Sequence, residues 1–218
     1  MKTEIRITGD GSFTLFVPEL DEHYHSTFGA LTESQHVFID AGLKPALQHF
    51  DEIHLLEIGF GTGLNAMLTI LEKSDKPIHY TAIEPYPVDT ETINLLADGL
   101  PGSSKELFLK LHNTSWEEEH RIIPNFYLTK IKSEIQNTAL LPNYFNMVYF
   151  DAFGPEVQPE MWTEAIFSKI SGSMVAGGIL TTYSAKGEVR RNLQKAGFEV
   201  ERIPGPSGKR HMTRAFRV

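Results

Sequence analysis

The sequence contains no cysteine among its 218 residues. This absence excludes disulfide bonds, thiolate zinc sites and cysteine nucleophiles, and it fits a reducing compartment. No run approaches the roughly eighteen apolar residues that a transmembrane helix requires. The opening residues, MKTEIRITGDGSF, also lack the apolar core of a signal peptide. We therefore expect a cytoplasmic protein with no membrane partner.

Metal-ligand patterns are also scarce. The chain has nine histidines, but none of them forms an H-x-x-x-H or H-E-x-x-H pattern. His23 and His25 are two residues apart and could share one face of a strand. Without a further ligand in sequence, we expect no metal site.

Positive charge is the minority, and it is unevenly distributed. The formal net charge is −8, which argues against non-specific binding of nucleic acid. Residues 186–218, however, carry nine Lys or Arg and three Glu, a net charge of +6 against −14 for the remainder. This end of the chain is therefore a candidate surface for a polyanion. The alternative interpretation is an ordinary solvated basic face.

The chain opens on a pattern of its own. Apolar residues that alternate around a Gly-Asp-Gly turn predict a β-hairpin over residues 4–17. A helical apolar spacing follows from Val37. We expect residues 1–45 to form this hairpin and a lid-like extension, and residues 46–218 to form the main domain.

From residue 53 onward, strand patterns alternate with helical patterns, which is typical of βαβ units and a mostly parallel sheet. The expected strands are 54–59, 78–84, 125–131, 145–151, 178–184, 198–203 and 213–218. The expected helices are 63–73, 88–99, 131–139, 160–171 and 186–196, and EEEH at 117–120 is expected to begin a solvated helix. The last two strands lie too close for a crossover helix, which predicts an antiparallel C-terminal strand in a hairpin at the sheet edge.

The stretch LLEIGFGTGLN is the first candidate site. It places Glu57, Gly59, Gly61 and Gly63 directly after a strand, where glycines allow a tight turn and a close approach to a ligand. A dinucleotide fingerprint, G-x-G-x-x-G, would need glycine where Leu64 stands. An acid before the first glycine repels a pyrophosphate but suits a cationic ligand, so the loop favours S-adenosylmethionine over a dinucleotide.

A ribose-binding acid is expected on the following strand. Glu84 ends that strand 21 residues after Gly63, where a carboxylate can accept hydrogen bonds from both ribose hydroxyls. Glu57 has two interpretations: it orders the ligand, or it accepts backbone N–H bonds within the loop.

The second candidate site is VYFDAFGPEVQPEMW. Asp151 ends a strand there, and ligands of open α/β sheets bind outside the carboxyl ends of strands. A carboxylate at this point can orient an amine acceptor and take or relay its proton during methyl transfer. Phe153 can stack on a base. The structural alternatives are a loop brace for Asp151 and lid packing for Phe153.

Three stretches carry a resemblance: LLEIGFGTGLN, FDAFGPEVQPEMWTEAIF and GGILTTYSAKGEVRRNLQKAGFEVERIPGPSGKRHM. They resemble, in order and spacing over about residues 20–218, the methyltransferase domain of MnmC, the tRNA (5-methylaminomethyl-2-thiouridine) methyltransferases. The resemblance implies a Rossmann-like class I methyltransferase fold and transfer of a methyl group to the exocyclic amine of 5-aminomethyluridine at the wobble position of the tRNA anticodon.

The resemblance also implies roles for individual residues. Gly59, Gly61, Gly63 and Glu84 fall on the cofactor site, and Asp151 falls on the acid that faces both the cofactor and the target amine. Tyr183, at the end of a strand, is a candidate substrate contact, with packing as the alternative. A basic surface for the anticodon arm is implied by five residues: Lys186, Arg190, Arg191, Lys209 and Arg210.

The sequence departs from the family in two ways. Many members are fused to a flavin-dependent oxidoreductase that generates the amine, and this sequence shows no such domain, so we expect a standalone enzyme linked to a separate source of the aminomethyl group. In addition, Lys130 stands where the family usually carries an acid after the third strand, and no residue is assigned to adenine.

The alternatives to this function are methylation of another RNA or a small amine, and a non-catalytic binding module. Aminopropyl transfer would require a second acid where Ala152 stands.

Overall fold

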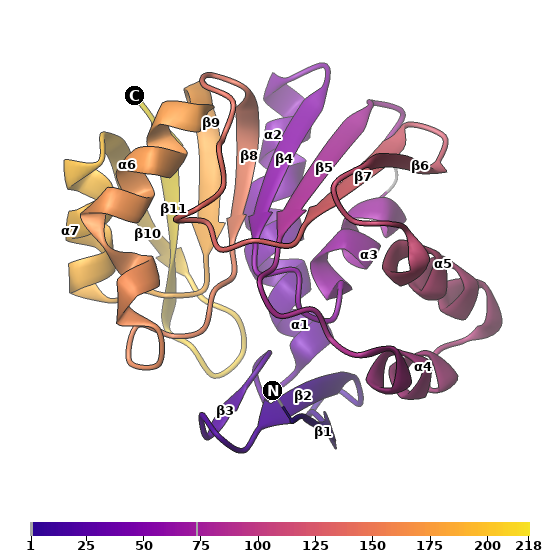
Figure 1. Ribbon diagram of the computed structural model, residues 1–218. Coiled ribbons are helices and arrows are strands. Elements are labelled where there is room, and N and C mark those ends of the chain that lie inside the picture. Colours follow the sequence, from indigo (N-terminus) through magenta and orange to yellow (C-terminus); the bar gives the residue numbers. More distant parts are fainter. Residues whose placement is uncertain (1, 73) are drawn as a thin grey trace.

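The computed structural model describes residues 2–72 and 74–218. Within them the chain forms an eight-stranded sheet with helices on both faces, and a three-stranded sheet beside it (Figure 1). The large sheet contains β4 (Ile53–Ile58), β5 (Ile78–Ile83), β6 (Glu119–Ile123), β7 (Phe126–Ile131), β8 (Phe145–Phe150), β9 (Met174–Thr182), β10 (Phe198–Pro204) and β11 (His211–Arg217). The helices after β4 are α3 (Leu64–Leu71), α4 (Thr90–Asp98), α5 (Gly102–Asn113), the 3₁₀ helix η2 (Pro159–Trp162), α6 (Glu164–Ser173) and α7 (Gly187–Lys195).

The centre of the large sheet is parallel. β4, β5, β7, β8 and β9 run in the same direction. Every residue of β8 is buried, because a parallel sheet is covered by helices on both faces. Side chains of η1, α3, α4 and α5 pack on one face, and side chains of α6 and α7 pack on the other. The predicted α/β class with a mostly parallel sheet is therefore confirmed.

The strand order creates a crevice. The order is β10-β11-β9-β8-β4-β5-β7-β6, so the chain winds one way from β4 to β7 and the other way from β8 to β10. The order in which strands are added to the sheet therefore reverses between the parallel neighbours β4 and β8, and ligands of open α/β sheets bind at such a point. The residues that follow these two strands are the glycine loop and Asp151.

All seven strands expected in the main domain are present, and each end lies within four residues of the expected one. The last strand, β11, is antiparallel to both of its neighbours and forms the predicted hairpin with β10. It lies one position inside the sheet, so the edge strand is β10.

Two expectations for the segments around β7 were wrong. Residues 131–139, predicted as a helix, form turns in which Thr138 donates to the carbonyl of Glu134 through both its amide (3.1 Å) and its hydroxyl (2.9 Å). Such local bonds from polar side chains compete with helix formation. EEEH, predicted to begin a helix, instead leads into β6, which pairs antiparallel with β7. β6 is a largely exposed edge strand, so its sequence lacks the usual apolar alternation.

The N-terminal part begins with the three-stranded sheet, which lies below the large sheet in Figure 1, and continues with helices that run up to β4. Its elements are β1 (Glu4–Ile7), β2 (Phe13–Val17), β3 (Glu22–His23), α1 (Ala30–Ser34), the π-helix η1 (Gln35–Leu43) and α2 (Lys44–His49). The predicted hairpin is confirmed, with Ile7 opposite Phe13. Asp10 in its turn accepts hydrogen bonds from the amide (2.9 Å) and hydroxyl (2.8 Å) of Thr32, which ties the hairpin to α1.

The helical run packs directly on the large sheet. A Cβ at Gly42 would lie 2.4 Å from Cε of Met147 on β8 and 3.0 Å from Oγ1 of Thr181 on β9, so glycine permits the close approach. The division of the chain at residue 45 falls inside α2 and stays a prediction. Among the described residues, no helix combines the length and the apolar character needed to cross a bilayer.

Candidate functional site

A cavity of about 1000 Å³ opens at the carboxyl ends of the central strands. Leu20 and residues 22–28 of the N-terminal part, with residues 208–211 of the β10–β11 loop and the start of β11, complete its walls. In the described part of the chain, seven carboxylate residues line it, namely Glu22, Glu33, Glu84, Glu134, Asp151, Glu156 and Glu160. Three Lys or Arg residues line it as well, namely Lys186, Lys209 and Arg210. This excess of carboxylates favours a cationic ligand.

The glycine loop between β4 and α3 has the backbone that its sequence predicts. Gly59, Gly61 and Gly63 have φ angles of 90°, 50° and 72°, in the left-handed region that favours glycine. A Cβ at Gly59 would lie 2.6 Å from the carbonyl oxygen of Asp151, and one at Gly61 would lie 2.9 Å from the ring of Tyr24. Only glycine fits at positions 59 and 61.

Glu84 joins the glycine loop to β5. Its Oε2 accepts a hydrogen bond from the amide of Gly61 (3.0 Å), and its Oε1 accepts one from the amide of Tyr86 (2.8 Å). The residue is 7% exposed, and burial raises the pKa of its carboxyl. Each oxygen keeps a second lone pair for a hydroxyl donor in the cavity.

Glu57 is set back from the cavity. It is fully buried and does not belong to the cavity wall. Its Oε1 accepts a hydrogen bond from Nδ2 of Asn65 (3.0 Å), and the same nitrogen donates to Oδ2 of Asp151 (2.8 Å). Asn65 was not predicted from the sequence, although its position directly behind the glycine loop, in GLN, was a signal for it.

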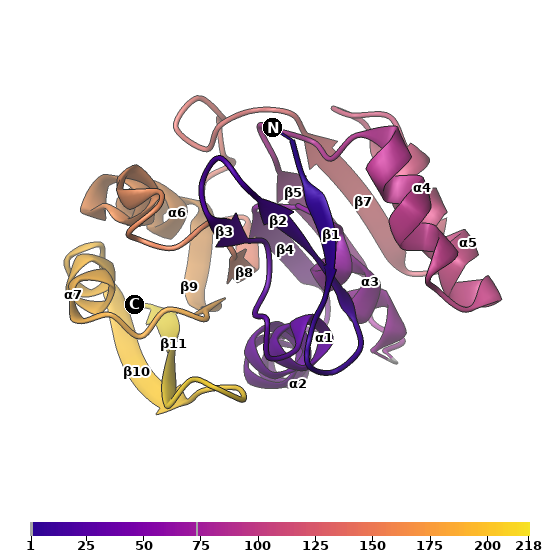
Figure 2. The ribbon, with the colours of Figure 1, turned by 90° about the horizontal axis from the view of Figure 1, so that it is seen from below.

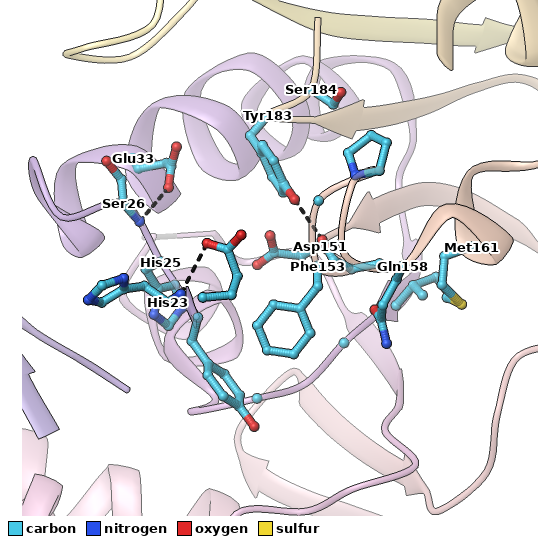
Figure 3. A pocket seen from close by; sticks show the side chains of 18 of the residues that line it. His23, His25, Ser26, Glu33, Asp151, Phe153, Gln158, Met161, Tyr183 and Ser184 are labelled. Atoms are coloured by element: carbon cyan, nitrogen blue, oxygen red, sulfur yellow. Dashed lines mark hydrogen bonds between the residues drawn. The ribbon is translucent and has the colours of Figure 1, made fainter. Parts of the chain in front are cut away.

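Asp151 lies at the centre of the cavity wall in Figure 3. Its amide donates to the carbonyl of Ile58 (3.0 Å), which fixes the end of β8 beside the end of β4. Burial raises the pKa of the Asp151 carboxyl to about 7, the Asn65 hydrogen bond lowers it, the charge of Glu33 raises it and Lys209 lowers it. A carboxyl in this range can exchange a proton near neutral pH.

Two aromatic side chains stand beside Asp151 (Figure 3). The ring of Phe153 meets the ring of Tyr24 edge-on, with centroids 5.1 Å apart. The hydroxyl of Tyr183 donates to the carbonyl of Ala152 (2.8 Å), and its ring packs edge-on against Trp162 at 5.9 Å. Both residues line the cavity, so Tyr183 combines a packing role with exposure to a ligand.

The five predicted basic residues do not form one group. Lys186, Lys209 and Arg210 line the cavity, whereas Arg190 and Arg191 lie on α7 outside it. Two of them have partners within the chain. Lys186 pairs with Glu156, and Nζ of Lys209 lies 2.5 Å from Oε1 of Glu33 and 4.2 Å from the centre of the Tyr183 ring.

The lid predicted from the N-terminal sequence contributes directly to the cavity. Tyr24, His25 and Glu33 line it, and Oε2 of Glu33 accepts a hydrogen bond from the amide of Ser26 (2.9 Å). Burial lowers the pKa of His25 to about 4, so this imidazole is neutral at pH 7. Nothing in the sequence pattern distinguished Glu33, because it reaches the site from another part of the chain.

Lys130 does not face this cavity. Its Nζ donates to the carbonyl of His112 (2.7 Å) and lies 4.9 Å from the centre of the Trp116 ring, at a separate cavity of about 270 Å³. Burial lowers its pKa to about 8. The residues after β7 that do line the main cavity are Glu134, Ile135 and Gln136. The described residues contain no cluster of three His, Asp or Glu side chains arranged to hold a metal ion.

Comparisons with known proteins agree with this geometry. The profile of a family described as S-adenosyl-L-methionine-dependent methyltransferase matches residues 105–218. The chain is 31% identical over 225 residues to the tRNA 5-methylaminomethyl-2-thiouridine biosynthesis bifunctional protein MnmC of Cupriavidus metallidurans, an alignment that covers 95% of this chain and 33% of that protein. It thus spans about a third of the length of the curated relatives it matches.

Solved structures show the same likeness. The crystal structure of MnmC2 from Aquifex aeolicus superposes with a TM-score of 0.81 at 27% identity, covering 99% of this chain and 70% of that one. Spermidine synthase from Thermotoga maritima superposes with a TM-score of 0.59 at 12% identity, covering 99% and 68%, which concerns the fold alone. The resemblance seen in the sequence and the class I methyltransferase fold are confirmed.

Proposed function

Since the chain belongs to the family of S-adenosyl-L-methionine-dependent methyltransferases, we propose that it methylates the exocyclic amine of 5-aminomethyluridine, with or without a 2-thio group, at the wobble position of tRNA. The observation that carries this proposal is that Asp151 and the glycine loop line one cavity. The similarity to MnmC over 95% of the chain points to the same amine.

The residues present fit S-adenosylmethionine. The glycine loop gives a ligand close access to the backbone, and Glu84 offers lone pairs to the two ribose hydroxyls. The carboxylates of the wall favour the sulfonium and ammonium groups of this cofactor. When bound, S-adenosylmethionine supplies an electrophilic methyl group on a positively charged sulfur.

Asp151 handles the acceptor. An amine attacks through its lone pair, so it must be neutral at nitrogen before transfer and must lose a proton afterwards. The carboxylate of Asp151 accepts an N–H hydrogen bond, orients the amine toward the methyl group and takes the departing proton. Transfer would form an N–C bond and break the S–C bond of the bound cofactor, and the electron pair of the S–C bond would stay on sulfur.

The mouth of the cavity suits an extruded nucleotide. Phe28 lines it, is 66% exposed and stands over Gly208 in the β10–β11 loop, which makes its ring a surface for a base next to the target. Phe153 and Tyr24 are the aromatic groups for the wobble base itself.

Arg191 and Arg210, both exposed, meet phosphates of the anticodon arm. This substrate implies a cytoplasmic location and a separate enzyme that supplies the aminomethyl group.

The test uses purified protein, methyl-labelled S-adenosylmethionine and two tRNA pools, one with 5-aminomethyluridine at the wobble position and one without it. After digestion, mass spectrometry identifies the labelled nucleoside. We expect label only in the first pool, and a loss of about 10²–10⁴-fold in rate for Asp151→Ala and Asp151→Asn. The matched control is Asp51→Asn, because the side chain of Asp51 is fully exposed.

Label in both pools, or in neither although the cofactor binds by calorimetry, would contradict the proposed substrate. Full activity in both Asp151 variants would contradict the role of this carboxylate and leave the substrate assignment standing.

A further inference from the structure

Asn65 connects two carboxyl groups that come from neighbouring strands. It is the second residue of α3 and is 3% exposed. Its Nδ2 donates one hydrogen to Oε1 of Glu57 (3.0 Å) and the other to Oδ2 of Asp151 (2.8 Å). The side-chain amide of Asn65 therefore donates both of its hydrogens to carboxyl groups. Of these two groups, only that of Asp151 faces the cavity.

Two adjoining carboxyl groups cannot both be charged in a buried site that has no cation between them. Glu57 is fully buried, and in the described part of the chain no Lys, Arg or His forms an ion pair with it. Burial, opposed only in part by the Asn65 hydrogen bond, raises the pKa of Glu57 well above its ordinary value. Glu57 is therefore the member that stays neutral, and Asp151 is the one that ionises as the pH rises through about 7.

We propose that Asn65 is a positioning residue for the reaction: its amide holds the Asp151 carboxylate toward the cavity and favours the ionised form, while Glu57 acts as a neutral acid that fixes the orientation of the amide. This inference rests on the proposed function for its catalytic meaning. It gives Glu57 a role behind the site, in place of the two roles considered from the sequence, which were ordering the ligand and accepting backbone N–H bonds within the loop.

The surroundings of Asp151 define the sign of the effect. Glu33 on α1 raises its pKa and Lys209 in the β10–β11 loop lowers it. Tyr183 at the end of β9 and Tyr80 on β5 are neutral, because burial raises the pKa of each hydroxyl well above its ordinary value. Asn65 supplies the hydrogen bond that opposes burial. Loss of its N–H groups therefore moves the pKa of Asp151 upward, away from about 7.

The experiment follows the carboxyl of Asp151 by carbon-13 NMR in protein labelled at aspartate, with Asp151→Asn identifying the signal. The protein carries no cofactor in this measurement, so the result does not depend on the proposed substrate. Asn65→Leu keeps the size of the side chain without its donors, and we expect the titration midpoint to rise by about one unit or more. Glu57→Gln is expected to leave the midpoint unchanged, because it replaces one neutral group by another.

The matched control is Thr69→Val, one turn further along α3. Thr69 is also buried, and its hydroxyl donates to the carbonyl of Asn65 (2.8 Å) and lies 3.1 Å from the hydroxyl of Tyr149, away from Asp151. This variant tests whether any buried polar loss in the helix moves the titration, and we expect no shift. With tRNA as substrate, the acidic limb of the kcat/KM profile should move with the midpoint in Asn65→Leu.

An unchanged midpoint in Asn65→Leu would overturn the proposal. If Asn65→Leu does not fold, the proposal is tested with Glu57→Gln. A fall in the titration midpoint of Asp151 in this variant would mean that Glu57 is ionised in the native protein, and this would overturn the proposal. A wild-type protein inactive on tRNA would refute the proposed function, whereas these titrations would still test Asn65.

Discussion

At the scale of the residue, the carboxyl of Asp151 links the site to the stability of the fold. Its pKa in the folded protein is about 7, against an ordinary value of 3.8. The folded state therefore binds more protons than the unfolded state between these two values, and linkage requires stability to fall as pH rises through this window. The cause is burial of a group that prefers water when charged.

The first prediction concerns Asp151→Asn. Asparagine keeps the shape but does not ionise, so the variant should gain stability relative to the wild type by about 1–3 kcal/mol between pH 5 and pH 8. Urea unfolding at the two pH values measures this difference. Asp51→Asn, at a fully exposed position, should show the same difference from the wild type at both. An equal gap at pH 5 and pH 8 for Asp151→Asn would contradict the raised pKa.

The sequence predicted the location of those candidate residues that lie where a strand pattern ends. Gly59, Glu84 and Asp151 could be placed because the carboxyl ends of parallel strands meet at one edge, and they line one cavity. Glu33 could not, because no periodicity shows that α1 reaches Lys209 across 176 positions of the chain. Glu57 could be identified from its motif, but the motif does not indicate that its side chain is buried behind the cavity wall.

At the scale of the element, the N-terminal part is fastened to the C-terminal hairpin. Glu33 is 8% exposed and pairs with Lys209, and His36 on η1 meets the carbonyl of Pro204 at 3.0 Å. Phe28 stands against Gly208. The wall of the cavity therefore depends on two elements from opposite ends of the chain.

The second prediction concerns this ion pair. Lys209→Met leaves Glu33 buried with the amide of Ser26 as its remaining donor, so we expect a loss of about 1–3 kcal/mol of stability. Glu33→Gln together with Lys209→Met should cost less than the sum of the two single changes, by about 0.5–3 kcal/mol. Urea unfolding at pH 7 gives all three values. Additive costs would show that the two side chains do not stabilise each other.

Helices and strands were predicted correctly where burial requires a regular pattern of apolar residues in the sequence. β4 and β8 are buried on both faces, so their apolar runs were plain. Four of the five residues of β6 are exposed or partly exposed, and the strand exists through its pairing with β7, so its sequence shows no apolar run. Residues 131–139 had apolar residues at helical intervals, but their polar side chains bond locally instead.

At the scale of the whole molecule, charge is segregated. A net charge of −14 outside residues 186–218 repels RNA, while that segment carries +6. A polyanion is thus steered to one side of the molecule, and binding should depend on salt. Figure 2 shows α7 and the β10–β11 hairpin together at one side, with α4 and α5 at the other.

The third prediction follows from this segregation. Arg191→Gln and Arg210→Gln should each weaken tRNA binding and reduce the slope of log affinity against log salt by about 0.7–0.9, the value for one lost phosphate contact. Fluorescence titration with labelled tRNA over a range of salt gives the slope. Lys105→Gln on α5 is the matched control and should leave it unchanged. If Arg191→Gln and Arg210→Gln had the same salt slope as the wild type and Lys105→Gln, the RNA would bind on another face.

The junction between the two ends of the chain has a consequence for synthesis. During translation the glycine loop, Glu84 and Asp151 leave the ribosome well before residues 208–211, which finish the cavity wall. β11, which lies between β9 and β10 in the sheet, follows both of them in the chain. A nascent chain that ends before residue 208 therefore contains the motif residues but lacks part of the wall of their cavity. We therefore expect a nascent chain to bind a ligand in this cavity only after the β10–β11 hairpin has been made and has paired with β9.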